Sequence, residues 1–224
     1  GSSRIDQQNV QLVDGASLAV YRENIAIGSD ASANLDSALL MNVSDLNLSA
    51  ANRVDVNSDT TVSGDTARFN TSLLSVAENT QFTVETSESL VLSGGSASVS
   101  GSFGPLGALT LSSTNIVLDG AKDGSGTQLQ LAADNVLVNA QQALKLRGES
   151  NVSFSNSAEL RSGLTYADEA LASLSVRAPG TIVFASNALE ENSKSNAGLG
   201  ARLDVTAGTI NVDAHMLFPI GAIS

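Results

Sequence analysis

The chain of 224 residues contains no cysteine, no tryptophan and a single histidine. The absence of cysteine excludes disulfide bonds and thiolate metal sites. One imidazole, that of His215, cannot build a histidine-rich metal site, and the sequence places no Ser-His-acid triad around it. We therefore expect no catalytic residue, no cofactor and no metal site, and we expect that the chain is not an enzyme.

Aromatic residues, positive charges and long apolar runs are also scarce. Aromatic residues make up only 4% of the chain, which favours a thin core of aliphatic side chains. The 11 basic residues face 23 acidic ones, for a net charge of −12. This balance excludes nucleic acid as a partner, because phosphate contacts need clustered lysine and arginine. The sequence has no apolar run of about 18 residues, so we expect no membrane span.

Short words of alternating apolar and polar residues fill most of the chain. In "LQLAADNVLVNA", which starts at Leu129, one apolar residue recurs at every second position within each word. This period of two is typical of strands with one buried face. Successive words follow at steps of seven or eight residues, separated by polar turns, and one consecutive series begins at Leu129, Val136, Leu144, Val152 and Leu160.

Three architectures accommodate many short strands. A sandwich or barrel favours longer strands, Asn-Gly hairpin turns and more aromatic residues, and a propeller needs a longer repeat. A parallel solenoid needs three short strands in each coil, and three steps of seven or eight residues supply that length. The intervals Leu18 to Leu39, Leu109 to Leu129 and Leu129 to Val152 are 21, 20 and 23 residues. We predict an all-β fold, a right-handed parallel β-helix of about nine coils, each of roughly 21–24 residues.

The solenoid is expected to span residues 4–215. Residues 1–3 (Gly-Ser-Ser) are interpreted as an expression scar, and the apolar residues 216–224 as a terminal cap or a continuation of the shaft. Three insertions, residues 94–108, 119–128 and 187–201, should protrude from the coils, where such loops often form a binding face. The segment from Tyr166 to Leu174 is the one place where a helical turn or two is expected.

Two groups of acidic residues are candidates for a cation site or a catalytic site. The loop "DGAKDGSG" from Asp119 lacks the alternating ligands and the closing glutamate of a calcium loop, so we interpret it as a solvated loop. The other carboxylates are spread over turns and outward positions without paired acids and flanking aromatics, which favours a role in solubility. They include Asp36, Asp45, Asp55, Asp59, Asp65, Asp134, Asp168, Glu169, Asp204 and Asp213.

The repeated shape LxLxAxxIxVxA resembles bacterial exoproteins of the filamentous haemagglutinin type. It is seen in "LTLSSTNIVLDG" (from Leu109), "LQLAADNVLVNA" and "LDVTAGTINVDA" (from Leu203), and the segment from Val43 to Gly64 is similar. That family contains large adhesins exported by two-partner secretion. The resemblance covers Leu18 to Val212, and it implies a right-handed β-helix that serves as a shaft, without catalysis in this stretch.

The expected function is a structural or adhesive segment of a secreted bacterial surface protein, which projects or presents a binding region. A chain without cysteine fits export across a bacterial envelope in an unfolded state. Its expected partner is a receptor or glycan on a host or bacterial surface, and the chain is expected to be a monomeric fragment of a longer protein. The alternatives are a polysaccharide lyase or hydrolase on the same scaffold, a phage or viral fibre segment, and a cytoskeletal polymer.

Overall fold

The computed structural model describes residues 1–6, 16–28, 38–97, 103–121, 126–188, 198–218 and 222–223. The regular structure of these residues consists of strands alone, and all of these strands belong to one parallel stack. The strands are β1 (Ser2–Ile5), β2 (Ser17–Ile27), β3 (Leu39–Asn42), β4 (Asp45–Val56), β5 (Thr60–Asn70), β6 (Leu73–Val76), β7 (Gln81–Ser93), β8 (Ala108–Asp119), β9 (Thr127–Ala132), β10 (Asn135–Arg147), β11 (Glu149–Phe154), β12 (Ser157–Ala167), β13 (Ser173–Ser186), β14 (Arg202–Asp213), β15 (Met216–Leu217) and β16 (Ala222–Ile223).

The strands form a β-solenoid with three faces, which we name by their members. Face A holds β1, the second halves of β2 and β4, then β6, β9, β11, the first halves of β13 and β14, and β16. Face B holds the first halves of β2 and β4, the second halves of β5, β7, β8, β10 and β12, and β15. Face C holds β3, the first halves of β5, β7, β8, β10 and β12, and the second halves of β13 and β14.

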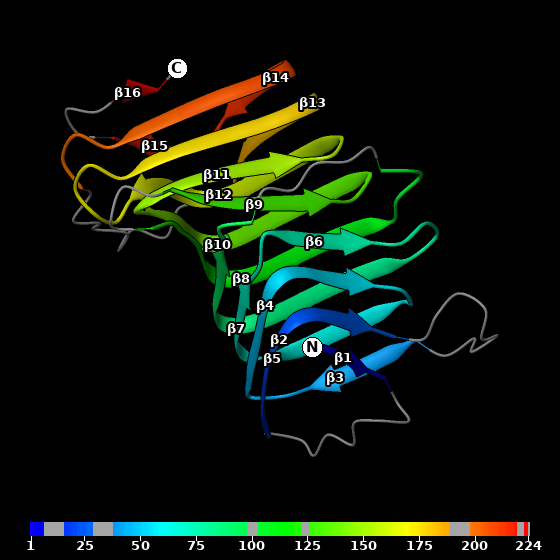
Figure 1. Cartoon of the computed structure of the whole chain (residues 1–224). Helices are drawn as coiled ribbons and strands as arrows, with labels where there is room; N and C mark the ends of the chain where they lie inside the picture. The colour runs from blue at the N-terminus through cyan, green and yellow to red at the C-terminus, as the bar shows by residue number, and fades with distance from the viewer. Residues whose placement is uncertain are drawn as a thin grey trace.

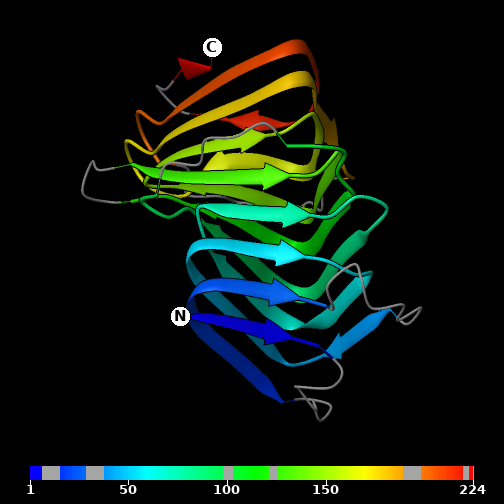
Figure 2. The ribbon, with the colours of Figure 1, turned by 45° about the vertical axis from the view of Figure 1, so that its right-hand side comes forward.

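The chain visits face A, then face C, then face B, and climbs by one strand spacing per coil. Figure 1 shows this climb from the blue N-terminal coils to the red C-terminal coils. In Figure 2 the strands on the near side point to the right while the chain rises from blue to red, and this combination makes the solenoid right-handed. The predicted fold class, an all-β parallel β-helix, is therefore confirmed.

The alternation within each apolar word is also confirmed. Successive words fall on successive faces, since Leu129 lies on face A, Val136 on face C, Leu144 on face B and Val152 again on face A. The predicted coil from Leu129 to Val152 is correct, because these two residues are register partners.

Two other predicted coil registers are wrong. Leu18 pairs with Leu46 on face B rather than with Leu39, which lies on face C. Leu109 pairs with Val136 on face C rather than with Leu129 on face A. The reason is that all three faces use the same Leu, Val and Ile words, so the apolar pattern does not distinguish one face from another.

The solenoid has about seven turns, fewer than the nine that were estimated. Some coils are longer than expected, since Leu174 pairs with Leu203, 29 residues later. Two turns also lack one described strand. After β7 the described chain returns to face C, so Leu74 of β6 pairs with Leu131 of β9. After β13 it returns to face A, so Thr165 of β12 pairs with Met216 of β15.

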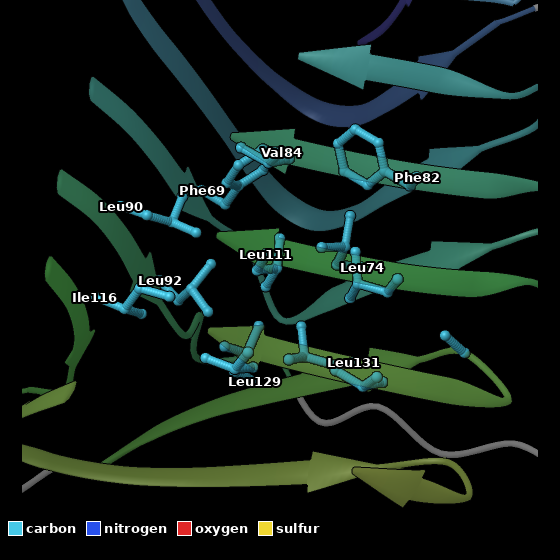
Figure 3. Close-up of a cluster of buried hydrophobic side chains, with 14 of the residues drawn as sticks. Phe69, Leu74, Phe82, Val84, Leu90, Leu92, Leu111, Ile116, Leu129 and Leu131 are labelled. Carbon is cyan, nitrogen blue, oxygen red and sulfur yellow. The ribbon is translucent and has the colours of Figure 1, made fainter. Parts of the chain in front are cut away.

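The core is a narrow column of aliphatic side chains supplied by all three faces. Figure 3 shows Leu74, Phe82 and Leu90 directed into the same interior from faces A, C and B. Phe69 and Phe82 meet edge to face, with ring centroids 6.0 Å apart. Each fully buried aliphatic side chain contributes about 1.5–3 kcal/mol. Because one coil cannot cover its own inner face, this stabilisation depends on the neighbouring coils.

The expected helical turns between Tyr166 and Leu174 do not form. Tyr166 and Ala167 continue β12, paired with Lys145 and Leu146 of β10. The chain then turns, with Leu171 at a φ of +59°, and enters β13. Pairing with the neighbouring coils thus outweighs the local helical pattern.

At the C-terminal end of the solenoid, apolar side chains of face C are exposed. Ile210 and Val212 are 44% and 61% exposed, whereas their register partners Ile182 and Phe184 are 0% and 2% exposed. Met216 and Phe218 pack against the core from residues 216–218, part of the segment interpreted as cap or continuation.

Candidate functional site

One hollow on the described surface lies at the corner where the chain turns from face A to face C. It has a volume of about 410 Å³ and is here named the corner hollow. Its lining is Phe103, Gly104, Leu106, Gln130, Asp134, Phe154, Ser155, Asn156 and Pro179. Three successive coils supply Asp134, Asn156 and Pro179 at equivalent turns, between β9 and β10, between β11 and β12, and within β13.

The backbone around the corner hollow is held by hydrogen bonds between coils. The Asp134 N–H donates to the Gly107 carbonyl at 2.9 Å, and the Gly180 N–H donates to the Asn156 carbonyl at 3.2 Å. The Gln130 amide donates to the Ser155 hydroxyl at 3.3 Å. These hydrogen bonds hold the backbone beneath the hollow in place, and the side chains of the turns project from it.

The described end of the first insertion forms one wall of this hollow. Phe103 and Leu106 belong to the expected insertion 94–108 and are partly exposed, while Leu106 also bridges to Ala77. Residues 98–102 of that insertion lie outside the described residues. Among the residues of this expected insertion, Phe103, Gly104 and Leu106 thus contribute to the lining of the hollow.

A second hollow lies beside the first, over the outer surface of face C. It measures about 280 Å³ and is named the face C hollow. The same coils line it, through Asn135, Val136, Leu137, Ser157, Ala158, Glu159, Thr181 and Val183. Glu159 accepts two hydrogen bonds from Arg161, at 2.9 and 2.6 Å, which offset its charge.

Many carboxylates join neighbouring coils instead of gathering in one site. Asp45 accepts hydrogen bonds from Ser17 at 3.0 Å and Thr66 at 2.7 Å, one residue in the coil before and one in the coil after. Asp55 likewise accepts one from Ser75 at 2.5 Å. Bonds of this kind between coils stiffen the outer surface.

The other acidic residues named from the sequence do not gather in one site either. Asp59 accepts from the Gln81 N–H at 2.8 Å, and Asp65 accepts from Ser87 at 3.0 Å. Asp204 pairs with Arg202 at 2.6 Å. Asp134 lines the corner hollow, and Asp36 lies outside the described residues. Within the described ranges no three His, Cys, Asp or Glu side chains meet in a group that could hold a metal ion.

The other candidates from the sequence are dispersed. His215 is exposed, and its carbonyl accepts a hydrogen bond from the Thr165 N–H at 2.9 Å. Asp119 ends β8 and lies 3.7 Å from Arg68, whereas residues 122–125 of its loop are not among those described. Across the described residues, no helix is long and apolar enough to cross a membrane.

Two residues near Asp168 at the end of face B, Arg147 and Tyr166, have shifted pKa values. Arg147 donates from Nε to Asp168 at 2.7 Å, and this bond is the main reason that the pKa of Arg147 is raised. Tyr166 is 8% exposed, and its burial, together with the negative charge of Asp168, raises the pKa of the phenol.

The raised pKa of Tyr166 predicts a loss of stability in alkali. Because the folded state keeps the phenol protonated, its stabilisation is complete below the unfolded pKa of about 10 and is lost as the pH rises through the higher folded value. Urea unfolding at pH 8 and pH 11 should show a smaller loss in Tyr166→Phe than in the unmodified chain. Tyr21→Phe, at a 60% exposed tyrosine, is the control. Equal losses in the unmodified chain and in Tyr166→Phe would refute the assignment.

Apart from the insertion residues 103–106, the sequence did not single out the residues of the corner hollow. Asp134 appeared only as one of many acids, and Asn156 and Pro179 not at all. The available signal was their spacing, since 22 residues separate Asp134 from Asn156 and 23 separate Asn156 from Pro179. No family model, no curated protein and no solved structure matches the chain.

Proposed function

We propose that this chain is a shaft segment of a secreted bacterial surface exoprotein of the filamentous haemagglutinin type. In this role it is exported by two-partner secretion and projects or presents a region that binds a receptor or glycan on a host or bacterial surface. The proposal combines the resemblance of the repeated words with the right-handed β-solenoid. A cysteine-free chain suits such export, because no disulfide can form before the coils stack.

The observation that carries the proposal is an inner column on face C that continues through seven coils. Every one of its side chains is at most 2% exposed, and each stacks on its register partner in the next coil. The column consists of Met41, Val62, Val84, Leu111, Val138, Leu160 and Phe184. An unbroken column of this kind resists bending, because bending would separate packed side chains and the hydrogen bonds between coils.

We also propose that this segment does not catalyse a reaction. The acids that accept hydrogen bonds from neighbouring coils, such as Asp45 and Asp55, already serve the stack. Glycosidases instead use two carboxyl groups about 5–10 Å apart across a scissile bond. Incubation with a panel of polysaccharides should release no new reducing ends or unsaturated products, and reproducible turnover would overturn this part of the proposal.

A stiff shaft predicts one well-defined distance between its ends. Leu40 and Asn211 are exposed and occupy the same outward position at opposite ends of face C, seven register steps apart. At about 4.8 Å per step their backbones should be roughly 34 Å apart. Because the chain has no cysteine, Leu40→Cys with Asn211→Cys gives two unique sites for spin labels.

Pulsed electron–electron double resonance then measures the distance. A shaft predicts a single narrow distribution centred near the backbone distance plus the reach of the labels. The matched control is Thr110→Cys with Leu137→Cys, on neighbouring strands, which should give a short distance. A broad distribution for the long pair, with the short pair intact, would show that the coils do not act as a rigid shaft.

A further inference from the structure

We propose that the corner hollow and the face C hollow together bind an uncharged oligosaccharide. Its long axis would run parallel to the strands, and the surface beneath it would be supplied by three coils. This inference rests on the proposed function, because it names the ligand class that the shaft would present. Its physical basis is the placement of polar and aromatic side chains on a fixed coil surface.

The two hollows are neighbours, because consecutive residues of the same coils line one and then the other. Asp134 of the corner hollow precedes Asn135 of the face C hollow, and Asn156 precedes Ser157 in the next coil. In both coils the chain therefore passes directly from the lining of the corner hollow to the lining of the face C hollow. The resulting surface is elongated and suits a chain-like ligand with several similar units.

The corner hollow offers both donors and acceptors within a small area. The amides of Gln130 and Asn156 can donate and accept, the Ser155 hydroxyl can do both, and the Asp134 carboxylate accepts. Neighbouring hydroxyls on a sugar ring present the same mixture of donors and acceptors. Its volume of about 410 Å³ falls in the usual range for small-ligand sites, about 300–1,000 Å³.

Apolar surface for the ring faces lies beside these polar groups. Phe103 is partly exposed on the wall, and Pro179 is exposed at the corner of the third coil. On face C, Leu137 and Val183 line the second hollow. A sugar ring has an apolar face of C–H groups that packs on such side chains while its hydroxyls reach the polar ones.

The charge of the site selects against anions. Asp134 lines the corner hollow, and the chain as a whole carries a net charge of −12. Acidic glycans would be repelled by both. The charge of Glu159 is offset by its two hydrogen bonds from Arg161, so the face C hollow has no excess positive charge to attract them.

The backbone of the corner does not favour an extended peptide. Strand addition requires free N–H and C=O groups along an edge. At this corner the N–H groups of Asp134, Ser155 and Gly180 already donate to carbonyls of neighbouring coils. Side chains, rather than a strand edge, therefore determine what binds here.

The test uses four neutral tetrasaccharides of different linkage as probes: cellotetraose, maltotetraose, mannotetraose and chitotetraose. Tetragalacturonate serves as the anionic comparison, and titration calorimetry with saturation-transfer NMR reports binding. We expect at least one neutral probe to bind with a Kd of about 1 mM or tighter and the anionic probe to bind more weakly. Asn156→Ala and Asp134→Ala should each weaken that binding about tenfold, because each removes polar contacts with the ligand.

Glu85→Gln is the matched control, because Glu85 is an exposed acid on face C outside both hollows. It should leave the Kd within about twofold, and circular dichroism checks that each variant keeps its strands. The inference is overturned if no neutral probe binds at about 10 mM, if tetragalacturonate binds more tightly, or if neither hollow variant changes the Kd.

The spin-label distances separate this inference from the proposed function. A narrow long distance without sugar binding would leave the shaft and remove the site. Sugar binding that depends on Asn156, together with a broad distance distribution, would leave the site and remove the shaft.

Discussion

Leu111→Asp is expected to unfold the solenoid. Leu111 is fully buried at the middle of the inner column on face C, stacked between Val84 and Val138. An aspartate there would lose its hydration without gaining a partner, or would have to stay protonated. The expected cost exceeds about 4 kcal/mol, which is comparable to the whole stability of many domains.

Thr110→Asp is the matched control for this substitution. Thr110 is the preceding residue and faces outward, so the same carboxylate would remain in contact with water. Its cost should stay below about 1 kcal/mol. Urea unfolding followed by circular dichroism compares the two variants, and a similar cost at both positions would show that the two residues do not lie on opposite sides of the strand.

Gly64→Ala is expected to destabilise the chain strongly for a different reason, the close approach of two coils. Gly64 lies where β5 turns from face C to face B, next to a register shift. A Cβ atom there would lie 1.8 Å from the Val43 carbonyl oxygen in the previous coil. Because that atom belongs to the backbone, relief requires the coils to separate locally. Overpacking of this kind costs about 1–3 kcal/mol, and we expect the upper end.

Gly104→Ala provides the comparison. No atom lies within 4 Å of a Cβ built on Gly104. The substitution should change the free energy of unfolding by less than about 0.5 kcal/mol. If chemical denaturation gave the same midpoint shift for Gly64→Ala and Gly104→Ala, the close contact between Gly64 and Val43 would be refuted.

The sequence was sufficient to predict the fold class and the register of Leu129 with Val152, but not the registers of Leu18 and Leu109. The alternation of Leu129 and Leu131 revealed strands, and steps of seven or eight residues revealed three strands per coil. The partner of Leu18 could not be identified, because Leu39 and Leu46 present equally suitable apolar words. The sequence also did not show on which face each of the two incomplete turns lacks a described strand, since the length of an insertion does not indicate the face.

The hollows were harder to foresee than the core. Buried positions follow a simple rule, because every coil needs aliphatic side chains inside. Asp134, Asn156 and Pro179 come from three turns that only the correct register places side by side. A polar residue in a turn is also the ordinary choice for the chain, so its identity gives little indication of a binding role.

Successive coils stack in parallel, with equivalent side chains in contact along the column. The most direct measurement is a methyl NOESY spectrum of the chain labelled at Ile, Leu and Val methyl groups. Parallel stacking at about 4.8 Å predicts cross-peaks between Val84 and Leu111 and between Leu111 and Val138. If those cross-peaks are missing and Leu111 instead contacts the strand word that follows it along the chain, as in an antiparallel hairpin, the β-solenoid is contradicted.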